Sequence, residues 1–159
     1  MDQVEQIWRW LDEVPDPEIP VVSVVDLGMV RGINVDAGKV EVEVSPTYSG
    51  CPATEVIEDT IVAVLQEHGI AEVSVKRVLA PPWTTDWISS AGREKLRAYG
   101  IAPPDDSAGK RELLGRGPIR CPRCGASRTT LISEFGSTAC KASLKCDECL
   151  EPFEYFKCI

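Results

Sequence analysis

The order of apolar and polar residues at the start of the chain predicts an amphipathic helix followed by a stiff loop. Apolar residues recur three or four positions apart, as on one face of a helix, at Val4, Ile7, Trp8, Leu11 and Val14. Asp2 followed by Glu5 matches an N-cap with its capping-box partner. Pro15, Pro17 and Pro20 then end the helix, because a residue that precedes proline avoids the helical conformation. The segment between them is rigid and acidic.

Alternating apolar and polar residues predict a β-hairpin after this loop. Residues 29–35 and 40–44 are its two strands. Apolar positions at helical spacing over residues 56–65 then predict a second helix, which Gly69 closes as a C-cap. Residues 73–79 predict a third strand. A right-handed crossover through the helix should lay this strand parallel to its predecessor.

The pattern predicts one further helix before the composition changes. Two prolines interrupt the third strand, and apolar positions from Trp87 to Leu96 suggest a last helix that Gly100 stops. The element order is α-β-β-α-β-α. The expected fold class is therefore α/β, a small α/β sandwich with three or more strands over residues 1–100.

Beyond this domain the chain changes character. Residues 101–117 are rich in proline, aspartate and glycine and poor in large apolar groups, which is typical of a linker. The final segment, residues 118–159, is too short to bury a self-sufficient core. Such a segment needs an additional cross-link, such as a structural metal ion, to fold.

Two C-x-x-C pairs in the final segment supply the ligands for such a metal ion. Cys121 and Cys124 form the first pair, and Cys146 and Cys149 form the second, with 21 residues between the pairs. This is the spacing of a four-cysteine zinc ribbon. Gly125 permits the turn in which backbone amides point at sulfur. Because protein would fill all four coordination positions, the zinc would be structural.

The cysteine pattern leaves alternatives open. The four residues could be reduced and unliganded, although a segment of this length would then lack an obvious source of stability. An iron–sulfur cluster also takes four thiolates, and spacing does not choose between the two. Cys140 and Cys158 are spare. They could be small buried apolar residues or a reversible thiol pair, or they could form a second metal-handling site.

Cys51 stands apart from the other cysteines, between the end of a strand and the start of a helix. Backbone amides and the helix dipole stabilise a thiolate at such a place, so a reactive thiol and a buried structural cysteine both remain open. Asp16 and Glu18 flank a proline and could ligate a metal beside Cys51, although solvated carboxylates are the commoner case. His68 lies at the far end of the following helix. That separation argues against a Cys-His thiol hydrolase.

Composition and charge exclude several classes of function. The 159 residues are 43% hydrophobic and 26% charged, as in a globular protein. No apolar stretch could cross a bilayer and no basic leader precedes the first helix, so we expect a soluble, cytoplasmic protein without a membrane partner. Residues 1–100 hold 8 Lys and Arg against 17 Asp and Glu, which argues against nucleic acid as a partner. An odd number of cysteines, seven, favours metal or thiol chemistry.

Several motifs carry a resemblance to a known family. In the first domain they are Asp16-Pro17-Glu18-Ile19-Pro20, Val25-Asp26-Leu27-Gly28, Thr47-Tyr48-Ser49-Gly50-Cys51-Pro52 and Trp83-Thr84-Thr85-Asp86-Trp87. This domain resembles the SufT-like domain, a family that includes iron–sulfur assembly and targeting factors. The tail, with its two cysteine pairs and the ending Glu151-Pro152-Phe153-Glu154-Tyr155-Phe156-Lys157-Cys158-Ile159, looks like one branch of that family, PaaD, also called PaaJ.

The resemblance implies a role as well as a fold. Members of this branch are bacterial phenylacetate-degradation proteins, needed for maturation of the multicomponent oxygenase that epoxidises phenylacetyl-CoA, and are not themselves the catalyst. Cys51 would be the thiol that handles iron or a nascent iron–sulfur cluster, with Asp16, Glu18 and Thr47 around it. The implied partners are the oxygenase reductase or other oxygenase subunits, and iron–sulfur assembly proteins. A stoichiometric structural subunit of the oxygenase is the alternative.

Overall fold

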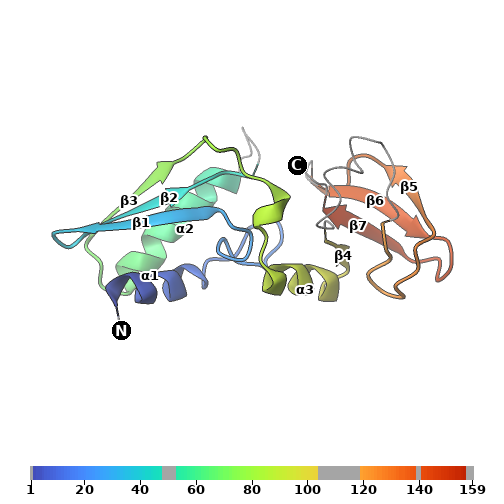
Figure 1. Cartoon of the computed structure of the whole chain (residues 1–159), viewed down its shortest axis with the longest axis horizontal. Helices are drawn as coiled ribbons and strands as arrows, with labels where there is room; N and C mark the ends of the chain where they lie inside the picture. The colour runs from blue at the N-terminus through green and yellow to red at the C-terminus, as the bar shows by residue number, and fades with distance from the viewer. Residues whose placement is uncertain (1, 48–52, 104–118, 139–140, 157–159) are drawn as a thin grey trace. The chain divides into compact units, whose positions relative to one another are not determined.

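The structure is a computed structural model that describes residues 2–47, 53–103, 119–138 and 141–156 (Figure 1). The chain divides into two compact units, Met1–Gly92 and Arg93–Ile159. Each unit has its own sheet, and the second carries the cysteine cluster, so the predicted α/β class with a C-terminal cysteine ribbon is confirmed. Within the described ranges, no helix is both long enough and apolar enough to cross a membrane.

The first unit is a three-stranded sheet packed with helices. In chain order its elements are α1 (Gln3–Leu11), β1 (Val30–Asp36), β2 (Lys39–Val44), α2 (Ala53–Glu67), β3 (Glu72–Arg77) and the 3-10 turn η1 (Thr85–Trp87). The strand order is β1-β2-β3. Strand β2 pairs antiparallel with β1 and parallel with β3, which confirms both the hairpin and the parallel crossover.

Alternation along β2 explains why the helices cover one face of this sheet. Val40, Val42 and Val44 are each at most 1% exposed and line the core side. Between them, Glu43 points to the opposite face, where it accepts a hydrogen bond from the ammonium group of Lys76 at 3.2 Å. One face is thus apolar and packs with α1 and α2, while the other is polar.

Helix α1 differs from its prediction at both ends. Asp2 occupies the N-cap position but makes no side-chain capping hydrogen bond, so the predicted capping box with Glu5 is wrong. The helix ends at Leu11, and Val14 follows in a turn where its amide donates to the carbonyl of Leu11. Val14 is nonetheless fully buried. The apolar periodicity runs past the helix because a loop residue packs into the same core.

The boundaries of β3 and of the last helix also differ from prediction. Strand β3 ends before Leu79, whose side chain is 67% exposed. Trp87 lies in η1 and not in the last helix, α3 (Ser90–Ala98). The guanidinium carbon of Arg31, on β1, lies 3.6 Å from the centroid of the Trp87 ring. This cation–π contact holds the Trp87 side chain against β1. Gly100 follows α3 with φ of +91°, as expected of a C-cap glycine.

The second unit contains a four-stranded sheet. Its strands are β4 (Ile101–Ala102), β5 (Thr129–Ser133), β6 (Lys141–Cys146) and β7 (Pro152–Phe156). The order is β4-β7-β6-β5, with β4 parallel to β7 and the other pairs antiparallel. Ile101 and Ala102, which the composition assigned to the linker, thus belong to a strand. The core is small and consists of Ala102, Cys121, Ala142, Leu144, Cys146 and Phe153.

Candidate functional site

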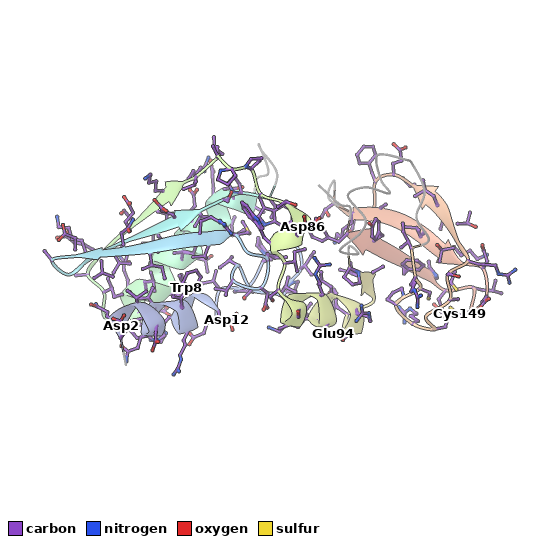
Figure 2. The ribbon with its side chains drawn as sticks, in the orientation of Figure 1. Asp2, Trp8, Asp12, Asp86, Glu94 and Cys149 are labelled. Carbon is purple, nitrogen blue, oxygen red and sulfur yellow. The ribbon has the colours of Figure 1, made fainter. Side chains whose placement is uncertain are left out.

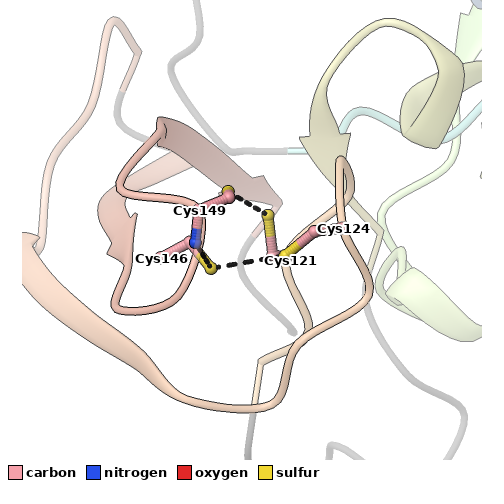
Figure 3. Close-up of side chains that lie close together, drawn as sticks. All are labelled: Cys121, Cys124, Cys146 and Cys149. Atoms are coloured by element: carbon pink, nitrogen blue, oxygen red, sulfur yellow. Dashed lines mark hydrogen bonds between the residues drawn. The ribbon is translucent and has the colours of Figure 1, made fainter.

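Four cysteine sulfurs meet in the second unit (Figure 3). Cys121 and Cys124 lie on a turn before β5, Cys146 ends β6, and Cys149 lies on the turn that leads to β7. All four Sγ atoms lie within 4.8 Å of one another. The Sγ atoms of Cys121 and Cys149 are 3.7 Å apart, and those of Cys124 and Cys146 are 3.5 Å apart. The fold therefore brings together the four residues that spacing singled out.

These distances fit a single tetrahedral ion. Four sulfurs placed about 2.3 Å from a zinc ion stand about 3.8 Å apart in a regular tetrahedron. The shorter separations between cluster sulfurs, 3.5 and 3.7 Å, are close to that value. A cluster of several irons between the same sulfurs would need a wider cage. The donor set suits one ion of zinc and leaves no coordination position for a substrate.

Two similar turns build this donor set. In the first turn, the amide of Gly125 donates to the carbonyl of Cys121 at 2.9 Å, and Gly125 has φ of +77°. In the second, the amide of Cys149 donates to Sγ of Cys146 at 3.5 Å, and Leu150 has φ of +64°. Glycine adopts this left-handed conformation without strain, whereas leucine does so at a cost. The spacing indicated the turns, but nothing in the sequence indicated a left-handed leucine.

Backbone amides and neighbouring thiols give the cysteines different proton affinities before a metal binds. The amide of Cys149 is the main cause that lowers the pKa of Cys146 to about 7, against the effect of desolvation. The amide of Glu151 lowers the pKa of Cys149, but desolvation and the three other thiols outweigh it and raise the pKa to about 12. Cys146 therefore ionises more readily than Cys149, and the thiolate is the form that binds a metal.

The acidic loop holds one of its two candidate carboxylates in place. Asp16 is 8% exposed, and its Oδ1 accepts hydrogen bonds from the amides of Glu18 at 2.8 Å and Ile19 at 2.9 Å. The side chain thereby shapes the loop it belongs to. Glu18 is exposed on the same loop, and Thr47 is half-buried just after β2. Cys51, Cys140 and Cys158 lie outside the described residues.

A buried polar network anchors the loop that follows α1. Asp26 is 5% exposed, its Oδ2 accepts from the amide of Ser23 at 3.0 Å, and its carbonyl accepts from the amide of Ser89 at 2.8 Å. The hydroxyl of Ser23 also donates to Asp12, labelled in Figure 2, at 2.5 Å. In the sequence, the motif that contains Asp26 indicates only a resemblance to the SufT-like family and assigns no role to Asp26. Its burial, which only the fold reveals, gives it a positioning role.

His68 and Trp83 also contact other parts of the first unit. His68 Nε2 lies 3.2 Å from the carboxylate of Glu13, and its ring stacks on Trp10 with centroids 4.5 Å apart. Trp83 is 3% exposed and donates its indole N–H to the carbonyl of Leu27 at 2.8 Å. These contacts tie α2 to the end of α1 and hold the segment after β3 against the core.

Comparison with known proteins gives this architecture a family. Residues 105–157 match the PaaD zinc beta ribbon domain, and residues 4–78 match the iron-sulfur cluster assembly protein family. An Escherichia coli K12 protein, named as a putative subunit of 1,2-phenylacetyl-CoA epoxidase, is 50% identical over 157 residues, which cover 99% of this chain and 94% of that protein. The chain belongs to the PaaD family.

Other relatives match about half of this PaaD-family chain. The Fe-S protein maturation auxiliary factor SufT of Staphylococcus aureus USA300 is 40% identical over 78 residues, covering 48% of this chain and 88% of that protein. The corresponding factor YitW of Bacillus subtilis 168 is 33% identical over 87 residues, covering 54% and 84%. This chain thus joins a SufT-like domain to a PaaD zinc ribbon.

Solved structures confirm the fold of the SufT-like part of this PaaD-family chain. A domain of unknown function, DUF59, from Bacillus anthracis aligns with a TM-score of 0.55 at 27% identity, covering 58% of this chain and 90% of that structure. A conserved hypothetical protein of Thermotoga maritima aligns with a TM-score of 0.50 at 30% identity, covering 60% and 94%.

Proposed function

We propose that this chain is a maturation factor of the multicomponent phenylacetyl-CoA epoxidase, which assists assembly or delivery of an iron–sulfur cluster to the oxygenase reductase. One observation carries the proposal: a single chain joins an iron–sulfur assembly domain to a PaaD ribbon and is matched over 99% of its length by a protein named as an epoxidase subunit. Relatives of the first domain are named as maturation auxiliary factors. The chain would accordingly be an accessory protein and not an enzyme.

The two parts of the chain divide the work in this proposal. The four ribbon sulfurs fit one ion with no position to spare, so the zinc is structural and the ribbon serves to dock a client. Transient iron or a nascent cluster is handled elsewhere, at Cys51, with Asp16, Glu18 and Thr47 around it. Partners are the reductase or other epoxidase subunits, together with iron–sulfur assembly proteins, all in the cytoplasm.

Anaerobic reconstitution tests the working thiol. The full-length protein, loaded with zinc and then treated with iron and sulfide, should take up a labile cluster that a Cys51→Ala variant does not hold. Cys140→Ala is the matched control, because it removes a cysteine that belongs neither to the cluster of four nor to the proposed working site. Equal uptake by the Cys51→Ala variant and the wild-type protein would remove Cys51 from the mechanism.

A second candidate function is a stoichiometric structural subunit of the epoxidase. The name of the Escherichia coli relative, which calls that protein a subunit, favours it. Co-purification at a fixed ratio with the active epoxidase would support this role. Full activity of an epoxidase that is produced without the chain, and whose clusters are reconstituted chemically, would exclude it and would be the expected result for a maturation factor.

A further inference from the structure

The outer edge of the ribbon sheet lacks the charges that usually guard an edge. Within the described residues, β5 has a neighbouring strand on one side only. Its five residues, TTLIS, include no charged side chain and no proline. The edges of the other sheet, β1 and β3, carry charged residues such as Arg31 and Lys76. Charges and prolines discourage an edge strand from pairing with another chain, and β5 has neither.

Apolar side chains are exposed along the same edge. Leu131 is 53% exposed, Ile132 is 59% exposed, and Phe135, two residues beyond the strand, is 64% exposed. Leu131 pairs in register with Leu144 of β6, which is 2% exposed in the ribbon core. Residues directly opposite each other in a sheet share a face. Leu131 thus lies on the core side of the sheet at its rim, where another strand would cover it.

The geometry points to a second copy of this chain as the occupant of this edge, with β5 pairing antiparallel with β5 of the other copy around a two-fold axis at Leu131. Such a pairing is isologous, because the same surface serves both copies. It places Thr130 opposite Ile132, Thr129 opposite Ser133, and Arg128 opposite Glu134. Each dimer then contains two facing pairs of opposite charge, one at each end of the paired segment, and two uncharged strands between them.

The register irregularity in β5 lies beside the proposed two-fold axis. Leu131 pairs with Leu144 and Ser133 with Ser143, so Ile132 is an extra residue in β5. A bulge of this kind increases the twist of an edge strand. Because the axis passes through Leu131, each bulge faces Thr130 of the other copy, and the pairing accommodates it in the same way at both ends.

The distribution of charge also favours contact through the ribbon. The chain has a formal net charge of −8, and like-charged copies repel. Residues 118–159, however, hold 6 Lys and Arg against 5 Asp and Glu, so they are nearly neutral. Two copies meet with least repulsion at this part of the chain. The inference concerns self-association and does not rest on the proposed maturation role.

Analytical ultracentrifugation of the zinc-loaded, full-length chain tests the dimer. The wild-type protein should show a concentration-dependent monomer–dimer equilibrium. Leu131→Lys places two ammonium groups at the two-fold axis and should raise the dissociation constant at least about tenfold. Leu79→Lys is the matched control, since it changes another exposed leucine, in the first unit, and should leave the constant unchanged. Zinc content and circular dichroism verify that each variant is folded.

A charge-swap cycle tests the register. Arg128→Glu and Glu134→Arg should each weaken the dimer roughly threefold or more, because either change sets like charges opposite one another twice per dimer. The two changes together should restore the wild-type constant. Arg128 also lies 3.6 Å from Glu148 within its own chain, so Glu148→Gln is included and should leave association unchanged.

Hydrogen exchange gives an independent readout. The amides of β5 should exchange more slowly at concentrations that populate the dimer than at high dilution. A chain that stays monomeric at millimolar concentration, a dimer insensitive to Leu131→Lys, or a double charge swap that fails to restore association would each overturn the proposal. Protection of β5 that requires a different protein would also overturn it and would assign the edge to a foreign strand.

Discussion

Loss of zinc should unfold the ribbon and leave the first unit intact. Two of the four ligands, Cys121 and Cys146, are also members of the small buried core of the second unit, so removal of the metal disrupts that core directly. The perturbation is either chelation or the substitution Cys146→Ser. Cys146 is fully buried, and a serine hydroxyl there cannot replace the thiolate that zinc requires.

The magnitude follows from the size of the core. In β6 and β7 the large buried apolar side chains are Leu144, Phe153 and Phe156, at 2%, 5% and 2% exposed. Full burial stabilises by about 1.5–3 kcal/mol for each such side chain, so the three contribute about 5–9 kcal/mol together. A structural zinc contributes about 10–16 kcal/mol in small zinc domains near neutral pH. The metal is the larger stabilising contribution, and the metal-free ribbon should not stay folded.

The positions of the tryptophans allow the two units to be followed separately. All four tryptophans, Trp8, Trp10, Trp83 and Trp87, belong to the first unit. Tryptophan fluorescence therefore reports the melting of that unit, while hydrogen exchange of the β6 and β7 amides reports the ribbon. Chelation should abolish protection of those amides and shift the fluorescence-detected midpoint by less than about 2 °C.

Cys140, which belongs to neither C-x-x-C pair, provides the control for this experiment. Cys140→Ser should retain one tightly bound zinc and full protection of β6 and β7. Protected β6 and β7 amides in a protein shown by metal analysis to be free of zinc would refute the reasoning, since the apolar core alone would then suffice.

Three further predictions concern the cluster turns and the core of the first unit. Zinc affinity should rise at least about a hundredfold per pH unit between pH 7 and 9, because Cys124 and Cys149, whose pKa values are raised, keep their protons in the metal-free cluster over this range and release them when zinc binds. Chelator competition measures this slope, and a tenfold slope would contradict the prediction. Gly125→Ala should weaken zinc binding about fivefold, because an alanine in the left-handed conformation costs about 1 kcal/mol even though its Cβ would meet no atom within 4 Å. Leu150→Gly should not weaken zinc binding, because glycine adopts this conformation without strain. The opposite order of affinities in a zinc titration would rule out the strain argument. Gly28→Ala should destabilise the first unit by about 2–4 kcal/mol in fluorescence-detected urea unfolding, because φ is +69° and the new Cβ would lie 2.7 Å from Cβ of Trp87. Gly38→Ala is the control. Its φ is +82° but the space around it is open, so the substitution should cost only about 1 kcal/mol.

The sequence predicted most of the first unit because its signals are local. Period-two alternation over residues 40–44 and helical periodicity over 56–65 each reflect one buried face, and the structure places β2 and α2 there. The crossover rule then predicted the parallel pairing of β2 with β3. Boundaries were less predictable, since an apolar residue such as Val14 contributes to the core whether it lies in a helix or in a loop.

Other features depend on residues that are distant in the sequence. Strand β4 contains only Ile101 and Ala102, and nothing in two residues indicates that they pair with Glu154 and Tyr155. The buried network of Asp26 likewise depends on Ser89, which lies far along the chain. Pairing partners at such separations are not encoded by any local period.

By itself, the sequence determined which residues could bind metal in the ribbon, because the spacing of two C-x-x-C pairs is a local property of the chain. Only the tertiary structure decided that the four sulfurs lie close enough for one ion and too close for a cluster of several irons, since that distance depends on how β6 and β7 pair. The fold likewise decided that the carbonyl of Asp26 meets the amide of Ser89 and that β5, within the described residues, has a neighbouring strand on one side only. Both depend on neighbours that are distant in the sequence and that only packing supplies.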